Sequence, residues 1–230
     1  MRIGGLQKNT LIDFPGKIAA LVFTRGCNLH CPYCHNPALV SMEGPEAMNE
    51  NEIFSFLEKR QNSLEGLAIT GGEPTLQKDL SEFCARVKAM GYPVKLDTNG
   101  SRPEVLKDLI KNRRIDFIAM DIKADPALYF PALSPKNMEE ELRESIKIIL
   151  ESGIPHEFRT TCVAPFVTEK MFSAVIPLIR GAERYSLQHF STESLLDENF
   201  FRENGRGLQT AEIDRLADLI RPHVQFLEVR

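Results

Sequence analysis

The stretch 18-IAALVFTRGCNLHCPYCHN-36 joins an apolar run to a loop that carries three of the five cysteines in the chain. The run from Ile18 to Thr24 is apolar almost throughout, which indicates a strand covered on both faces. Cys27, Cys31 and Cys34 follow with the spacing C-x3-C-x2-C. Cubane iron–sulfur clusters usually take four cysteine ligands, so a loop with three leaves one iron for another ligand.

Composition and charge are those of an ordinary globular chain. Of 230 residues, 43% are hydrophobic and 26% are charged, and the net charge is −4. This charge argues against a nucleic-acid partner or an anionic membrane surface. No apolar run reaches the roughly 18 residues of a membrane span, and the N-terminus has no signal-peptide pattern. We therefore expect a cytoplasmic protein, with its cysteines reduced in a metal site rather than paired in disulfides.

Beyond the cysteine loop, strands alternate with helices. The pattern predicts strands over 18–24, 67–70, 94–98, 116–122, 157–163 and 185–190, and helices over 52–60, 80–90, 103–111, 139–151, 169–179 and 210–220. Such alternation implies parallel strands joined by right-handed crossovers. A closed eight-unit barrel needs about 250 residues, so six units predict an α/β fold with a partial, open (βα)6 barrel.

We expect a single domain over residues 1–230. Residues 1–17 form an N-terminal lead-in, and residues 191–230 form a C-terminal extension with a helix and a last strand over 224–229. In a parallel barrel, functional residues gather at the C-terminal ends of the strands. The polar and glycine residues near those ends are Cys27, Cys31, Cys34, Gly71 to Pro74, Asp97 to Gly100, Asp121, Lys123, Arg159 and His189. Their placement predicts an active site on one rim.

With these motifs the sequence resembles the radical S-adenosylmethionine (SAM) superfamily. The cysteine loop has the C-x3-C-x-aromatic-C form of that family, with Tyr33 as the aromatic residue, and 71-GGEP-74 matches its GGE motif. Within the superfamily it resembles the activating enzymes of glycyl radical enzymes, above all the activating protein of anaerobic ribonucleoside-triphosphate reductase. That likeness lies in 10-TLIDFPGK-17, 97-DTNG-100 and 120-MDIK-123. A barrel of the radical SAM type is therefore expected.

The resemblance implies one [4Fe–4S] cluster on Cys27, Cys31 and Cys34, with SAM chelating the remaining iron. It implies reductive cleavage of SAM to methionine and a 5′-deoxyadenosyl radical. That radical takes hydrogen from a backbone glycine of a partner such as anaerobic ribonucleoside-triphosphate reductase, after electron delivery by a donor such as flavodoxin or ferredoxin. Cys84 and Cys162 are predicted to be small buried hydrophobes.

The resemblance also implies a set of cofactor-binding residues beyond the cysteines. These are Tyr33, His35, Gly71, Gly72, Glu73, Asp97, Asn99, Asp121, Lys123, Arg159 and His189. In the glycyl-radical activators, a monovalent cation is held near the positions of Asp97 and Asp121, beside the SAM carboxylate.

Structural alternatives stay open for several of these residues. Glu73 accepts from the SAM ammonium or braces the GGE turn. Asp121 and Lys123 lie on the same side of an extended segment, so a salt bridge is the alternative to a SAM contact. Arg159 lies in a buried strand and needs an anionic partner, which SAM or a carboxylate of the chain supplies. His189 is a ribose contact or a core histidine.

Two other functions fit part of the sequence. A small-molecule radical SAM enzyme resembling 7-carboxy-7-deazaguanine synthase shares the cysteine, GGE and Asn-Gly elements. A zinc-binding interaction module would combine the cysteines with His30 or His35. Brown colour after anaerobic purification separates the zinc module from the enzymes, and a bound magnesium with a small pocket favours the small-molecule enzyme.

Overall fold

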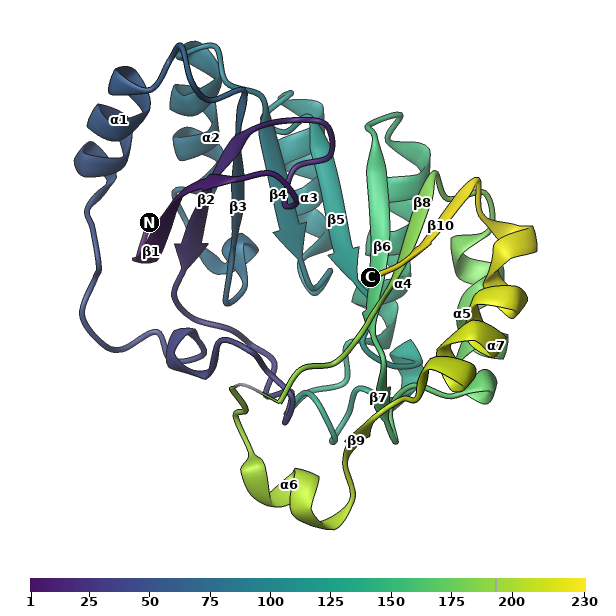
Figure 1. Ribbon diagram of the computed structural model, residues 1–230. Coiled ribbons are helices and arrows are strands. Elements are labelled where there is room, and N and C mark those ends of the chain that lie inside the picture. The colour runs from purple at the N-terminus through teal and green to yellow at the C-terminus, as the bar shows by residue number, and fades with distance from the viewer. Residues whose placement is uncertain (193) are drawn as a thin grey trace. The chain divides into compact units, whose positions relative to one another are not determined.

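The computed structural model describes residues 1–192 and 194–230, and Figure 1 shows their elements along the chain. The contacts divide the chain into two units whose segments alternate in sequence. Unit 1 consists of Met1–Asn28, Ala38–Thr98 and Glu104–Ile118, and unit 2 consists of Leu29–Pro37, Asn99–Pro103 and Ala119–Arg230. The expectation of one domain stays a prediction.

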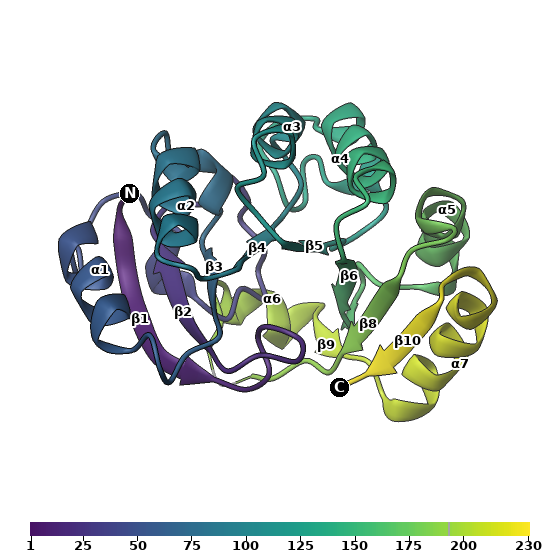
Figure 2. The ribbon, with the colours of Figure 1, turned by 90° about the horizontal axis from the view of Figure 1, so that it is seen from above.

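Unit 1 is an α/β layer in which apolar strands are covered by helices. Its strands follow the order β1 (Ile3–Thr10), β2 (Ala19–Thr24), β3 (Gly66–Gly71) and β4 (Val94–Thr98). β2, β3 and β4 are parallel, whereas β1 is antiparallel to β2. The helices are α1 (Glu50–Lys59), α2 (Leu80–Ala89) and α3 (Pro103–Lys111), and Figure 2 shows α2 and α3 on the same face of the strands.

The sequence does not predict the strand β1, since residues 1–17 are expected only to form an N-terminal lead-in. Its sequence, IGGLQKNT, has no alternation of apolar and polar residues, and this alternation is the signal by which a half-buried strand is found. Ile3 and Thr10 are buried at its two ends. The pairing with β2 therefore rests mainly on backbone hydrogen bonds, which sequence patterns do not report.

Unit 2 repeats the same construction with parallel strands. β6 (His156–Thr161), β8 (Arg184–Gln188) and β10 (Phe226–Val229) lie in that order, while the residues of β5 (Phe117–Asp121) divide between the units. The helices are α4 (Glu139–Glu151), α5 (Glu169–Ile179) and α7 (Thr210–Ile220), and α7 contacts both α5 and β10. β10 confirms the expected last strand.

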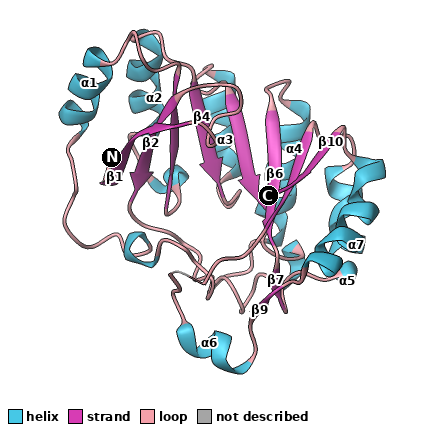
Figure 3. Ribbon diagram, viewed as in Figure 1, coloured by secondary structure: helices cyan, strands magenta, loops and turns pink. Residues whose placement is uncertain are grey.

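Shorter elements complete the chain. A ladder of β7 (Val163–Ala164) with β9 (Arg206–Gly207) and the helix α6 (Glu198–Glu203), visible in Figure 3, were not expected. Single 3-10 turns are η1 (Pro37–Leu39), η2 (Pro74–Leu76), η3 (Pro126–Leu128) and η4 (Arg221–His223). None of the helices in the described residues has the length and apolar character that a membrane crossing requires.

The predicted α/β class is confirmed by parallel strands alternating with helices in both units. All six predicted strands form, with ends within two residues of the predicted ones. In the described part of the chain, β1 pairs only with β2 and β10 only with β8. Each is an edge strand of its unit, as an open barrel requires.

Candidate functional site

In unit 1, the GGE segment is hydrogen-bonded to the backbone that enters the cysteine loop. The Gly72 amide donates to the Thr24 carbonyl at 2.9 Å, and the Glu73 amide donates to the Gly26 carbonyl at 2.7 Å. A Cβ on Gly72 would lie 2.2 Å from the Gly26 oxygen, and one on Gly71 would lie 2.4 Å from backbone atoms of Thr24. Gly71 also has a φ of 112°, which other residues rarely adopt. The chain's own backbone packing therefore requires both glycines.

The Glu73 carboxylate is buried and holds the turn that follows the glycines. Its Oε1 accepts from the Thr75 amide at 3.0 Å, from the Thr75 hydroxyl at 2.5 Å and from the Thr98 hydroxyl at 2.8 Å. These contacts are those of the bracing alternative. Thr98, at the end of β4, belongs to the 97-DTNG-100 motif but was not predicted as a site residue.

On β4, Asp97 is paired with a lysine that the sequence analysis also missed. Lys95 is 1% exposed, and its Nζ forms a hydrogen-bonded ion pair with Asp97 Oδ1. The two side chains share a face because they lie two residues apart on a strand. The Phe117 ring centre lies 6.0 Å from the same nitrogen. The available signal was the spacing of a lysine two residues before Asp97 in the strand 94-VKLDT-98.

In unit 2, three predicted residues meet at the end of β5. Arg159 Nε donates to Asp121 Oδ1 at 2.8 Å, and Lys123 Nζ donates to Asp121 Oδ2 at 3.2 Å. Burial by itself would raise the pKa of Asp121, but the charges of Arg159 and Lys123 hold it well below its ordinary value. Burial by itself would lower the pKa of Lys123, but Asp121 raises it. All three groups are therefore charged at neutral pH, with a net charge of +1.

Two tyrosines fix the backbone of Lys123. The Tyr33 hydroxyl donates to the Lys123 carbonyl over a long 3.4 Å, and the Lys123 amide donates to the Tyr129 hydroxyl at 2.7 Å. Burial raises the pKa of both phenols. The charge of Cys31 also raises the pKa of Lys123. Tyr33 thus ties the unit 2 part of the cysteine loop to the segment that brings an ammonium group near Cys31.

The cysteine loop divides between the units, with Cys27 in unit 1 and Cys31 and Cys34 in unit 2. The Cys27 amide donates to the Val40 carbonyl at 2.9 Å, and the Cys34 amide donates to the Cys31 carbonyl at 3.0 Å. Cys31 is buried, Cys27 and Cys34 are half-buried, and no cysteine forms a disulfide. Across residues 1–192 and 194–230, no three His, Cys, Asp or Glu side chains form a ready metal-binding group.

The chemistry of these donors fits an iron–sulfur cluster. Three reduced thiols lie within eight residues of an anchored loop, and a cluster takes thiolates. The ammonium of Lys123, whose pKa the charge of Cys31 raises, provides a positive charge near this thiol. The assignment of Cys27, Cys31 and Cys34 as cluster ligands stays a prediction.

Six aromatic side chains of unit 2 contact one another in a series that begins and ends on the cysteine loop. Successive ring centres are separated by 5.5, 5.5, 5.2, 4.8 and 5.6 Å along the series Tyr33, Phe166, Phe200, Phe201, Phe190 and His35. The Asp197 amide donates to the Pro32 carbonyl at 3.1 Å. We call these six residues the aromatic cluster. Its four phenylalanines were missed, because their positions follow no periodicity.

The other predicted residues have simpler surroundings. The Asn99 side-chain oxygen accepts from the Ser101 amide at 2.9 Å, which forms an Asx turn. His189 is exposed, and its backbone amide donates to the Arg230 carbonyl at 2.7 Å. The alternative of a core histidine is therefore wrong.

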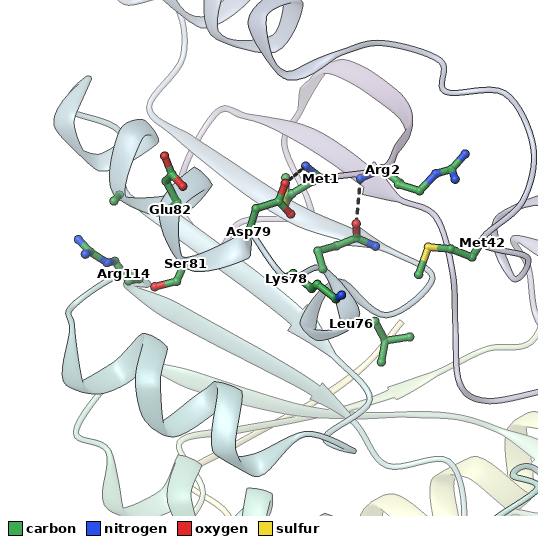
Figure 4. A pocket seen from close by; sticks show the side chains of 11 residues that line it. Met1, Arg2, Met42, Leu76, Lys78, Asp79, Ser81, Glu82 and Arg114 are labelled. Atoms are coloured by element: carbon green, nitrogen blue, oxygen red, sulfur yellow. Dashed lines mark hydrogen bonds and ion pairs between the residues drawn. The ribbon is translucent and has the colours of Figure 1, made fainter.

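A pocket of unit 1, shown in Figure 4, contains none of the predicted site residues in its lining. It has a volume of about 850 Å³ and is lined by charges of both signs, including Asp79, Glu82 and Arg114. The Met1 ammonium pairs with Asp79, and the Arg2 amide donates to Gln77 Oε1 at 2.8 Å. This balance of charges indicates no particular ligand.

Thiol reactivity tests the placement of the cysteines. Burial raises the pKa of the Cys84 and Cys162 thiols to about 12, so at pH 8 each is a thiolate in about 1 of 10,000 molecules. In the iron-free protein, iodoacetamide should label Cys27 and Cys34 and spare Cys84 and Cys162, as read by peptide mass spectrometry. Equal labelling of all four would contradict the structure.

The contact between the GGE segment and the loop entrance predicts a cost for Gly72→Ala. The added Cβ overlaps the Gly26 carbonyl, and overpacking of this kind costs about 1–3 kcal/mol of unfolding free energy. Gly5→Ala is the matched control, because its Cβ would meet nothing closer than 3.7 Å. Urea unfolding of the iron-free protein measures both. A Gly72→Ala variant as stable as the control would show that this backbone contact does not form.

Sequence comparisons point to one superfamily. The profile of the Radical SAM superfamily matches residues 21–179. A Methanocaldococcus jannaschii protein, provisionally named a glycyl-radical enzyme activating enzyme, is 34% identical over 86% of this chain and 83% of its own. The pyruvate formate-lyase-activating enzyme of Clostridium pasteurianum is 26% identical over 83% and 82% of the two chains. The 7-carboxy-7-deazaguanine synthase of Koribacter versatilis is 30% identical over 67% of each.

Solved structures share the fold at low sequence identity. SuiB of Streptococcus suis bound to its precursor peptide SuiA has a TM-score of 0.64 and 14% identity, covering 90% of this chain and 47% of SuiB. SuiB bound to S-adenosylmethionine has a TM-score of 0.64 and 16% identity, covering 89% and 48%. With the profile match over more than half of its length, the chain belongs to the radical SAM superfamily.

Proposed function

We propose that this chain is an activating enzyme that generates a glycyl radical in a partner protein. The observation that carries the proposal is the likeness to the M. jannaschii relative, which extends over most of both chains. With a [4Fe–4S] cluster and SAM bound, the cofactors supply reductive cleavage to methionine and a 5′-deoxyadenosyl radical, which removes hydrogen from a backbone glycine. The partner we favour is an anaerobic ribonucleoside-triphosphate reductase.

In this proposal, Cys27, Cys31 and Cys34 hold the cluster, and the charged residues bind SAM. SAM carries a carboxylate, an ammonium and a sulfonium. Lys123 and Arg159 place two positively charged groups beside Asp121, which supports their role toward the SAM carboxylate. Tyr33, His35, Gly71, Gly72, Glu73, Asp97, Asn99 and His189 complete the proposed set.

In the proposal, the aromatic cluster protects the carbon radical from side reactions. It brings four half-buried phenylalanines to the unit 2 part of the cysteine loop, and we propose that they limit the access of water to the radical. A carbon radical needs a dry site, since side reactions compete with abstraction from the intended glycine. We place the reaction in the cytoplasm, with flavodoxin or ferredoxin as the electron donor.

Electron paramagnetic resonance of a reconstituted mixture tests the proposal. The protein is loaded anaerobically with iron and sulfide, reduced, and mixed with SAM and purified candidate glycyl radical enzymes. A glycyl doublet is expected in one partner only, and only when SAM is present. SAM cleavage with no radical in any glycyl radical enzyme would count against the proposal.

A second function has one specific observation in its favour. The K. versatilis 7-carboxy-7-deazaguanine synthase is 30% identical to this chain over two thirds of its length. An enzyme that resembles it would transform a small molecule and need no protein partner. Turnover of SAM driven by a small-molecule substrate, with no effect of glycyl radical enzymes, would favour this second function.

The cluster assignment predicts the effect of removing one thiol. Cys31→Ala should lose the cluster and the cleavage of SAM, because two cysteines do not hold a cubane. Cys162→Ala is the control, since this thiol is buried, lies outside the cysteine loop and should leave iron content unchanged. Iron analysis, visible absorbance and 5′-deoxyadenosine formation measure the result. A Cys31→Ala variant with full iron content would overturn the assignment of this ligand.

A further inference from the structure

The two carboxylates at which the family likeness implies a monovalent cation already have cationic partners. Asp97 pairs with Lys95 within unit 1, and Asp121 pairs with Arg159 and Lys123 within unit 2. A monovalent metal ion binds where carboxylate charge is left uncompensated. These residues therefore do not fit such an ion.

Lys95 lies in the buried interior of unit 1 rather than at its surface. Its strand position is paired with Ala68 on β3, which is paired in turn with Leu21 on β2, so the three side chains share one face. All three are buried. The small Ala68 leaves room for the lysine side chain beside it, and Phe117 faces the ammonium.

A lysine in such surroundings stays charged only with an anionic partner. Burial of an unpaired ammonium is strongly unfavourable, and Asp97 supplies the negative charge. The converse also holds, because Asp97 is buried and needs a cation. Lys95 provides that cation from a position two residues away on the same chain. Asp97 therefore keeps a cationic partner at any salt concentration.

The second carboxylate has more than enough compensation. Arg159 and Lys123 contribute two positive charges to one negative charge on Asp121. Asp121 therefore already has two cationic partners, and a metal ion added here would have to displace one of them.

We propose that Lys95 takes the place of the monovalent cation, so that this chain binds SAM and folds independently of Na⁺ and K⁺. Lys95 is thus a positioning residue, which sets the charge and orientation of Asp97. The SAM part of the proposal rests on the proposed function. The folding part does not, since it concerns only the charge balance within unit 1.

The wild-type protein gives the first test. The melting temperature, and SAM affinity of the cluster-loaded protein by calorimetry, are measured in NaCl, KCl and choline chloride at equal ionic strength. Both quantities should agree among the three salts, with affinities within about twofold. Tenfold weaker SAM binding in choline, restored by Na⁺ or K⁺, would overturn the proposal.

Lys95→Met gives the second test, because methionine keeps the length of the side chain and removes its charge. Asp97 is then buried without its tethered cation, so the melting temperature should fall in choline chloride and recover in NaCl or KCl. Lys88→Met is the control, since the Lys88–Asp116 pair is more exposed and its loss should show no ion-specific recovery. Equal melting temperatures of Lys95→Met in all three salts would overturn the proposal.

A double variant covers the case in which Lys95→Met does not fold. Lys95→Met/Asp97→Asn removes both charges and should fold with no response to Na⁺ or K⁺. Ion-specific stabilisation of the double variant would show that the cation binds elsewhere and would contradict the proposal. The melting temperatures require neither cluster nor SAM. A protein that fails to bind SAM at all would therefore refute the proposed function, while the melting temperatures would still test the role of Lys95.

Discussion

The organisation of unit 1 depends on backbone hydrogen bonds between the segments that leave β2 and β3. Beyond the ends of β2 and β3, the amides of Gly72 and Glu73 donate to the carbonyls of Thr24 and Gly26. The parallel pairing of the two strands thereby continues into the start of the cysteine loop. The segment that leaves β3 has no room for a side chain at Gly71 or Gly72. The GGE motif is in this sense a structural element, which fixes where the chain to Cys27 leaves the sheet.

Buried charges are the second organising feature, and each of them has a polar or charged partner in its own unit. Unit 1 contains the Lys95–Asp97 pair and the Glu73 carboxylate, which accepts from Thr75 and Thr98. Unit 2 contains Asp121 between Arg159 and Lys123. A buried ionic group persists only when such partners satisfy it. Polar side chains near the strand ends therefore hold their orientation before a ligand binds, which is the preorganisation that a cofactor site needs.

The sequence predicted the α/β class and all six parallel strands because short strand-like segments alternate regularly with helical segments along the chain. It also found Asp121, Lys123 and Arg159, which meet in unit 2 as an ion-pair network. It missed β1, Lys95 and the aromatic cluster. These depend on tertiary contacts. β1 is held by pairing with β2. The phenylalanines of the aromatic cluster come from segments up to 35 residues apart in sequence, which is the separation of Phe166 and Phe201. Neither periodicity nor a short motif reports such contacts.

The central claim is that hydrogen leaves a glycine of a protein partner and not a small molecule. Isotope transfer tests it directly. A purified anaerobic ribonucleoside-triphosphate reductase carrying glycine deuterated at Cα is mixed with the reduced, cluster-loaded protein and SAM, and the 5′-deoxyadenosine formed is analysed by mass spectrometry. We expect 5′-deoxyadenosine carrying one deuterium, in an amount that matches the glycyl radical formed. Unlabelled 5′-deoxyadenosine from the deuterated partner, in the same amount as in its absence, would contradict abstraction from this glycine.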